Sequence, residues 1–234
     1  MKLSIIVPAH NEEDNIGSLI DKIGLILKID FELLVVNDHS SDSTTRIVLE
    51  KAKLFNNLRL IENKSDAGFG NTLRTGFANA SGDFILPLMA DLCDDLDTIS
   101  IMYEEINKGY DVVCGSRYIK GGARIGGSNL KGILSSLAGW SAYYLLGIST
   151  HDIANAFKMY RKKVIDSIDI EAKGFEISME LPLKAYYAGF KITEVPTVWR
   201  ERKKGKSSFR MFNLVPNYLK IYLWAIKKRL LKLK

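Results

Sequence analysis

The sequence is poor in the residues that hold small folds together through covalent or metal links. Its 234 residues include only two cysteines, Cys93 and Cys114, too few for a four-cysteine metal site or a disulfide framework. This usage favours a reducing compartment. Five prolines, no low-complexity tract and no internal repeat argue against a long linker. With 47% hydrophobic and 26% charged residues, the chain is typical of one large globular domain, with or without an extension.

Several motifs are absent as well. The apolar run at residues 3–7 is too short for a signal peptide, so none is expected. No Gly-x-Gly-x-x-Gly follows this run, and no Gly-x-x-x-x-Gly-Lys-Ser/Thr occurs anywhere in the chain. These absences disfavour a dinucleotide-dependent dehydrogenase and a P-loop nucleotide hydrolase.

Acidic residues are missing from the C-terminal end. From Lys203 onward there are ten basic residues and no acidic one, whereas the preceding part has 23 basic and 27 acidic residues, a net charge of −4. A mildly acidic domain with a basic tail favours a local anionic partner at the tail, such as a membrane surface, phosphate or nucleic acid. A nucleic-acid partner would rest on this charge alone, and none is expected.

The first half of the chain alternates short apolar runs with amphipathic stretches. Strands are predicted at residues 3–7, 31–36, 58–62, 83–88 and 111–116. Helices are predicted between them, at residues 12–27, 42–55, 70–80 and 97–109. Strands alternating with helices of this length indicate an α/β fold with a mostly parallel sheet flanked by helices.

The second half departs from this alternation. A long helix is expected from Lys131, and its uncharged span 132–150 approaches the length of a bilayer crossing. Its serines and glycines favour a buried or interfacial helix instead. A strand, a helix and a strand broken at Pro196 are expected next, at residues 155–160, 174–189 and 191–199.

The chain is predicted to close with a basic amphipathic helix. We place the boundary between a catalytic domain, 1–210, and this helix, 211–234. Its apolar face is predicted to enter a membrane interface while its lysines and arginines meet anionic headgroups. The side chains expected to enter the interface are Ile221, Trp224, Ala225, Leu230 and Leu231.

Polar residues gather directly after the predicted strands. The strand ends lead into "PAHNEE", "NDHSSDST", "NKSDAGFG", "MADLCDD" and "GSRY". In an open parallel sheet, ligands bind beyond the carboxyl ends of the strands. A pocket is therefore expected at this edge of the sheet, with Asp38 suited to accept hydrogen bonds from a ribose or a base.

Three carboxylates, those of Asp91, Asp94 and Asp95, crowd the end of the fourth predicted strand. They admit two interpretations: oxygen ligands for a divalent cation, or acids placed at the positive end of the next helix. Cys93, between them, is expected to fill space because a thiolate suits Mg²⁺ poorly.

Taken in order, "SIIVPAHNEEDNI", "VVNDHSSDST", "NKSDAGFGNTLRTGF", "ASGDFILPLMADLCDD" and "DVVCGSRYIKGG" resemble an inverting family 2 glycosyltransferase with a GT-A fold. The later blocks "FKMYRKKVI" and "GFEISMELPLKAYYAGFKITEVPTVWRERKKGKSS" are similar to the dolichyl-phosphate mannosyltransferase branch. That branch moves a sugar from a nucleotide to a polyprenyl phosphate. The resemblance covers about residues 3 to 208.

The resemblance implies a set of donor-binding residues. The nucleotide is expected at Pro8, Ala9, His10, Asn11, Glu12, Asp38, Lys64, Ala90 and Asp91. A Mg²⁺ or Mn²⁺ cofactor on the donor diphosphate is expected at Asp91, with Asp94 as a second ligand. The first aspartate of the family's Asp-x-Asp element is Met89 here, so the protein is expected to supply fewer ligands than usual.

The resemblance also implies an acceptor side. Arg117, Lys131, Arg202 and Ser207 are expected to bind the acceptor phosphate, and Asp91, Asp152, Arg117 and Arg202 to serve catalysis. A phosphate is already an anion at neutral pH and needs cations to position it, whereas a hydroxyl needs a general base. The basic residues Arg124 and Arg200 add to the first reading, while Asp152 and Glu180 keep a hydroxyl acceptor open.

The expected enzyme is a hexosyltransferase using a GDP- or UDP-sugar and a lipid-linked acceptor, bound peripherally to the inner, cytoplasmic face of the membrane. The sequence leaves two alternative functions open. One is transfer to a sugar or glycolipid hydroxyl. The other is a catalytically inactive nucleotide-sugar-binding homologue, suggested by Met89.

Overall fold

The computed structural model describes residues 1–202, 204 and 211–232, and within the last helix the side chains of residues 214–231. Seven strands form a central sheet in the order β3-β2-β1-β4-β7-β5-β8. Their bounds are β1 Leu3–Ala9, β2 Phe31–Asn37, β3 Leu58–Glu62, β4 Phe84–Pro87, β5 Val112–Ser116, β7 Lys158–Arg161 and β8 Ile192–Pro196. The predicted α/β fold with a mostly parallel sheet is confirmed.

One strand breaks the parallel pattern. β7 runs antiparallel to β4 and β5 on its two sides, whereas all other neighbours in the sheet are parallel. The strand itself was predicted, but its direction depends on the long excursion that separates β5 from β7 in the chain. Direction is set by how that excursion returns to the sheet, which local periodicity does not report.

A second, two-stranded sheet joins β6 (Ala123–Ile125) and β9 (Val198–Arg200) in parallel. Pro196 ends β8, as the sequence indicated, and the chain then enters this small sheet as β9. β6 was not predicted. It has only three residues and is partly exposed, so it has no extended apolar pattern to detect.

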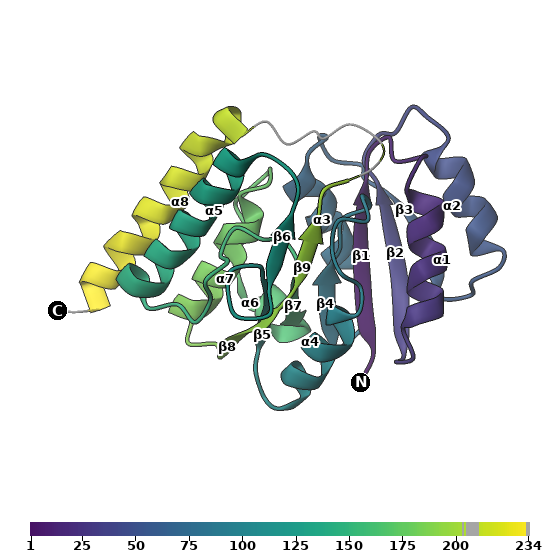
Figure 1. Cartoon of the computed structure of the whole chain (residues 1–234). Helices are drawn as coiled ribbons and strands as arrows, with labels where there is room; N and C mark the ends of the chain where they lie inside the picture. The colour runs from purple at the N-terminus through teal and green to yellow at the C-terminus, as the bar shows by residue number, and fades with distance from the viewer. Residues whose placement is uncertain (203, 205–210, 233–234) are drawn as a thin grey trace.

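Helices cover both faces of the central sheet (Figure 1). Their bounds are α1 Ile16–Ile26, α2 Thr44–Ala52, α3 Phe69–Asn79, α4 Thr98–Asn107, α5 Asn129–Ser141, α6 Lys162–Ser167, α7 Ile177–Tyr187 and α8 Met211–Lys232. A π-helical turn, η1 (Ala142–Leu146), continues α5. No helix in the described ranges is both long and apolar enough to span a membrane.

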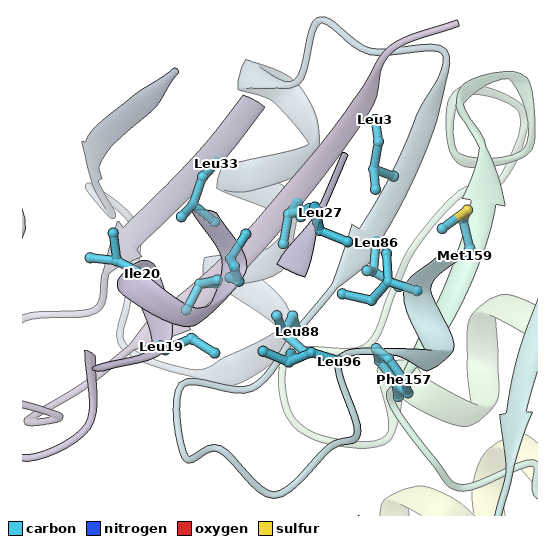
Figure 2. Packing of buried hydrophobic residues seen from close by; sticks show 14 of the residues in the cluster. Leu3, Leu19, Ile20, Leu27, Leu33, Leu86, Leu88, Leu96, Phe157 and Met159 are labelled. Carbon is cyan, nitrogen blue, oxygen red and sulfur yellow. The ribbon is translucent and has the colours of Figure 1, made fainter. Parts of the chain in front are cut away.

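The core follows the alternation of side chains along the strands. Leu3, Ile5 and Val7 of β1 point to one face, where they join residues of α1, α2 and α4. Figure 2 shows part of this cluster, with Leu19 and Ile20 near strand residues such as Leu33. Ile6 points to the other face and joins a second cluster with residues of α3, η1, α7 and α8.

The C-terminal helix packs on this second cluster and lies beside α5 at the end of the molecule away from α1 and α2 (Figure 1). The Tyr222 hydroxyl donates to Ser141 Oγ of α5 at 2.7 Å. Ala225 is fully buried, and Ile221 and Trp224 pack against the core. The prediction that Ala225 enters a membrane interface is therefore wrong, whereas Ile221 and Trp224 are only partly buried and the prediction for them stays untested. Leu230 and Leu231 are exposed, together with Leu219 and Leu223.

Candidate active site

The loops after β1 and β2 are bonded to each other. His10 Nδ1 lies 2.6 Å from Asp38 O. Asn11 has a φ of 54°, and this left-handed turn directs its backbone N–H to Ser40 Oγ at 3.0 Å. Its side-chain oxygen accepts from Ser41 N at 2.8 Å. Pro8 and Ala9 are the last residues of β1, so the expected nucleotide-binding residues of the first loop stand at the carboxyl edge of the sheet.

The Asp38 carboxylate joins three segments at the same edge. It is 8% exposed. Its Oδ1 accepts from Asn63 Nδ2 at 2.8 Å, and its Oδ2 accepts from the backbone N–H of Gly68 at 3.0 Å. Gly68 precedes α3 directly. Lys64, expected to contact the nucleotide, is exposed. Asp38 is thus held rigidly, with lone pairs left to accept hydrogen bonds from a ligand.

A guanidinium group links the first and fourth loops. Arg202 Nη2 lies 3.0 Å from Asp91 Oδ2 and 3.2 Å from Glu12 Oε1. Glu12 Oε2 accepts from Asn15 Nδ2 at 2.8 Å, which fixes the carboxylate. Burial opposes the charge on Arg202, but its bonds to Asp91 and Glu12 outweigh burial and raise its pKa. Residues 12, 91 and 202, far apart in the sequence, therefore meet in one cluster.

Asp91 and Asp94 stand close enough to influence each other. Leu92 has a φ of 59°, and Asp91 Oδ1 accepts from Cys93 N at 3.2 Å. Burial, followed by the charge on Asp91, raises the pKa of Asp94 to about 7. Burial also raises the pKa of the Cys93 thiol, so the thiol is neutral at physiological pH. This supports the interpretation of Cys93 as a small space-filling residue.

These residues fit a divalent cation that is completed by its substrate. Two neighbouring carboxylates repel each other, and the Arg202 guanidinium on Asp91 and Glu12 shows that the position attracts positive charge. Among the described residues, no group of three His, Cys, Asp or Glu side chains surrounds a metal position. The protein would supply the oxygens of Asp91 and Asp94, and the diphosphate and water the remainder. Metal binding by these two residues stays a prediction.

Arg117 and Asp152 form a buried pair at the end of β5. Arg117 Nε lies 2.7 Å from Asp152 Oδ2, and Nη2 lies 2.8 Å from Oδ1. The Arg117 backbone N–H also donates to Oδ2, at 3.0 Å. Burial would lower the pKa of Arg117, but the Asp152 carboxylate outweighs it and holds the pKa above its usual value. The cation is thus permanently charged and fixed in direction by a two-pronged contact.

α5 borders this pair. Arg117 Nη2 donates to Ser135 Oγ at 3.1 Å. Lys131 lies one turn before Ser135, on the same side of the helix. The sequence reasoning missed Ser135 as a site residue; its spacing of four residues from Lys131 was the available signal. Ser207 and Gly205 of the expected Arg-x-x-Gly-x-Ser element lie outside the described residues.

Two other charged groups have structural partners. Glu180 is 2% exposed, its two oxygens accept from the backbone N–H groups of Glu171 and Ala172 at 2.9 Å, and Lys184 pairs with it at 2.7 Å. The Arg124 guanidinium lies over the Trp199 ring, 4.9 Å from its centroid. Both side chains stabilise local structure, so Glu180 is poorly placed to act as a general base.

Comparison with known proteins relates the chain to enzymes that transfer sugars. The model of "Glycosyl transferase family 2" matches residues 4–169. A dolichol-phosphate mannosyltransferase of Pyrococcus furiosus is 29% identical over 96% of this chain, which spans 64% of that relative's length. A polyprenol monophosphomannose synthase of Mycolicibacterium smegmatis is 28% identical over 97% of this chain and 88% of its own.

The fold has a solved counterpart. A glucosyl-3-phosphoglycerate synthase from Mycobacterium tuberculosis, crystallised with Mn²⁺, UDP and glucosyl-3-phosphoglycerate, superposes with a TM-score of 0.73. The alignment covers 97% of this chain and 80% of the other, at 18% identity. At this identity the likeness establishes the GT-A fold.

Proposed function

We propose that the chain, which belongs to glycosyltransferase family 2, is a hexosyltransferase of the dolichyl-phosphate mannosyltransferase-like branch, a proposal supported by its similarity to two relatives of that kind. We propose that it transfers a hexose, with inversion, from a GDP- or UDP-sugar to the phosphate of a polyprenyl lipid. The catalytic domain is proposed to comprise residues 1–210. The donor, the acceptor and the metal are parts of this proposal.

The Arg117 guanidinium carries the proposal for the acceptor. Its charge is fixed by Asp152, which is fully buried, and its Nη2 also reaches Ser135 of α5, the helix that carries Lys131. A phosphate acceptor needs such cations and no base. The carboxylates considered as bases for a hydroxyl acceptor both have partners: Asp152 is bound to Arg117, and Glu180 to two backbone N–H groups and Lys184.

The donor is proposed to bind across the first four loops. Asp38 accepts hydrogen bonds from the nucleoside, and the β1 loop from Pro8 to Glu12 borders it. Asp91 and Asp94 hold the Mg²⁺ or Mn²⁺, which neutralises charge on the leaving diphosphate when bound. With a cation held by Asp91, the Arg202 guanidinium would exchange its contact with Asp91 for a phosphate oxygen. The acceptor phosphate is positioned by Arg117, Lys131 and Arg202 for attack on the anomeric carbon.

A face of exposed apolar side chains on α5, η1 and α8 supports the lipid acceptor. We call it the two-helix apolar face; it comprises Leu130, Ile133, Leu134, Leu137, Trp140, Tyr143, Tyr144, Leu145, Val215, Leu219, Leu223, Leu230 and Leu231. Such an exposed apolar area marks an interaction surface. Lys131, Lys220, Lys227 and Lys228 accompany it, and residues 211–232 contain no acidic group.

We propose that this face lies on an anionic bilayer at the inner side of the membrane. Apolar side chains with nearby lysines match the acyl and headgroup layers. Ser135 of α5 touches Arg117, so the same helix borders both the bilayer and the acceptor site. A lipid phosphate at the headgroup level would reach Arg117 without leaving the membrane.

The proposal is tested by product formation. The purified chain is incubated with radiolabelled GDP-mannose, UDP-glucose or UDP-GlcNAc, with polyprenyl phosphate and with Mn²⁺ or Mg²⁺. We expect label in the lipid phase from one donor, and loss of that label with Arg117→Gln. Label transferred to a glycolipid lacking phosphate would show a hydroxyl acceptor instead. Metal-dependent nucleotide binding without any turnover would identify an inactive homologue.

A further inference from the structure

One carboxylate oxygen next to the site is buried without a partner. Glu176 immediately precedes α7 and is 5% exposed. Its Oε1 accepts from Gly174 N at 3.2 Å and from Asn217 Nδ2 at 3.3 Å. Its Oε2 has no hydrogen-bond partner in the described part of the chain. Leaving such an atom unpaired destabilises the fold, so a buried orphan oxygen calls for a ligand that the protein alone does not supply.

The loop before α7 touches the nucleoside end of the site. The Phe175 ring stacks on Phe69 of α3 with centroids 4.5 Å apart. The backbone N–H of Gly70 donates to Lys173 O at 2.9 Å. The residue before α3, Gly68, donates to Asp38. The loop that precedes Glu176 is therefore bonded to the start of α3, which in turn bonds to the carboxylate proposed to hold the nucleoside.

The first turn of α7 touches the acceptor end of the site. Ser178 Oγ donates to Ala154 O at 3.1 Å, in the turn that begins at Asp152. The Tyr218 hydroxyl of α8 donates to Phe175 O at 2.9 Å. Burial raises the pKa of this hydroxyl to about 12, so it remains a donor at neutral pH. The segment around Glu176 thus contacts both the start of α3, which bonds to Asp38, and the turn that follows Asp152.

A glycine keeps the space beside the orphan oxygen open. A Cβ atom at Gly174 would come within 2.7 Å of Glu176 Oε2. Gly174 is itself partly exposed, so a ligand group can approach from that side. The chemistry of the oxygen limits the choice of group, because a carboxylate accepts hydrogen bonds and repels phosphate. A hydroxyl fits.

We propose that Glu176 Oε2 accepts a hydrogen bond from a hydroxyl of the donor's hexose and thereby contributes to the choice of sugar. In a nucleotide sugar, the hexose follows the nucleotide on the side of the incoming acceptor, and the segment around Glu176 contacts both the nucleoside end and the acceptor end of the site. The inference rests on the proposed function for the identity of the donor. It assigns a specificity role to a residue outside the expected site.

The test measures the contribution of the hexose to binding affinity separately from that of the nucleotide. Calorimetry with Mn²⁺ gives the dissociation constants of GDP and GDP-mannose, and of UDP and UDP-glucose. The ratio of nucleotide to nucleotide-sugar constants measures what the hexose contributes. We expect Glu176→Gln to lower this ratio about tenfold for the preferred sugar, as for a hydrogen bond to a charged group, with affinity for the bare nucleotide within about twofold.

Two further variants sharpen the comparison. Gly174→Ala fills the space beside Oε2 without changing charge and is expected to lower the ratio as well. Glu171→Gln makes the same chemical change in the same loop, at a side chain that is 66% exposed, and is expected to leave the ratio unchanged. Thermal denaturation of each variant shows that it is folded.

The inference is overturned by an unchanged ratio in Glu176→Gln, by an equal loss of affinity for the bare nucleotide, or by a wild type in which the hexose adds no affinity. These measurements need no acceptor. If the wild type binds nucleotide sugars but forms no lipid product, the proposed function is contradicted. The role of Glu176 is then still decided by the ratio of dissociation constants.

Discussion

Asp91 has the most demanding role proposed for a single residue. It is the only aspartate of the Asp-x-Asp position that the chain retains, since Met89 replaces the first. Without ligand it shares the Arg202 guanidinium with Glu12. A cation on the diphosphate must therefore displace an existing ion pair, so metal is expected to bind weakly until the donor arrives.

Replacing Asp91 by Asn is predicted to lower turnover by about 100-fold or more, because a Lewis-acid metal contributes several kcal/mol to charge stabilisation. Steady-state kinetics at several Mn²⁺ concentrations checks this. The neighbouring Asp95→Asn serves as the control and is expected to retain most activity. Tight Mn²⁺ binding by the wild type without nucleotide would contradict the proposed site.

Glu32, which lies outside the candidate site, makes the free energy of unfolding depend on pH. Burial acts to raise its pKa, but bonds from Ser4 Oγ and from the backbone and side chain of Ser81 outweigh burial and lower it. A carboxyl with a lowered folded-state pKa stabilises the protein above its unfolded pKa. That contribution is lost as the pH falls through the folded pKa.

We predict that the wild-type free energy of unfolding declines below about pH 4.5, the ordinary pKa of glutamate, and that Glu32→Gln shows a shallower decline and lower stability at pH 7. Urea denaturation between pH 3 and pH 7 measures both. Glu50→Gln, at an exposed ion pair with Arg46, should follow the wild-type curve. Identical slopes for all three proteins would contradict the role of Glu32.

At the scale of elements, α3 is pressed against the sheet through Gly76. A Cβ at this position would lie 2.3 Å from Ile6 Cγ2 of β1 and 3.3 Å from Val36 Cγ2 of β2. The helix approaches the strands closely because this residue has no side chain. The first turn of α3 borders the Asp38 carboxylate, because Gly68, directly before the helix, donates its backbone N–H to it.

Gly76→Ala is expected to destabilise the protein by about 1–3 kcal/mol through overpacking, although alanine favours helices by about 1 kcal/mol over glycine. Chemical denaturation measures the change. Gly17→Ala in α1 is the matched control, since its Cβ would meet Ile47 Cγ2 at 3.3 Å, and it should lose less. Equal effects of the two substitutions would remove the steric explanation.

α5 and α8 together form the surface that we place on the membrane. The exposed fraction is 60% for Leu137 on α5 and 55% for Leu223 on α8. Each is predicted to lose contact with acyl chains when replaced by serine. Burial of one leucine contributes about 1.5–3 kcal/mol, or roughly tenfold in binding.

Sedimentation with anionic phospholipid vesicles is expected to show this loss for Leu137→Ser and for Leu223→Ser, with weaker binding at high salt. Leu25→Ser alters an equally apolar side chain, 72% exposed on α1, away from α5 and α8 (Figure 1). This control should bind like the wild type. Unaltered binding of the α5 and α8 variants would place the membrane contact elsewhere.

At the scale of the whole molecule, α8 belongs to the second core cluster as well as to the surface. Ala225 is fully buried, and Tyr218, Ile221 and Trp224 pack against that cluster. The Tyr187 hydroxyl donates to Ala225 O at 2.8 Å. The boundary that we predict at residue 210 therefore separates two roles, while apolar packing connects the two parts.

Deletion of residues 211–234 is predicted to lower stability by several kcal/mol, because the apolar surface under α8 becomes exposed. Differential scanning calorimetry of the 1–210 fragment and the full chain measures this. A full-length variant with Tyr222→Phe, which removes only the bond to Ser141, should lose about 1 kcal/mol. A fragment as stable as the full chain would identify 1–210 as an independent domain.

The sequence by itself determined the alternation of strands and helices, because apolar periodicity and chain length are local properties. It also placed the polar residues at the strand ends, since the carboxyl ends of parallel strands lie at one edge. The ordered motifs were sufficient to identify the family that the comparisons then showed. Asp38 was chosen from its position after a strand, whereas the roles of Asp91 and Arg117 came from the resemblance to the family.

Only the tertiary structure decided which of these residues meet. The contacts of Arg202 with Glu12 and Asp91, and of Arg117 with Ser135, join segments far apart in the chain. The antiparallel direction of β7 and the burial of Ala225 likewise depend on how distant segments pack. The unpaired oxygen of Glu176 also depends on the tertiary structure, because the groups around a residue, and not the residue itself, determine whether it finds a partner.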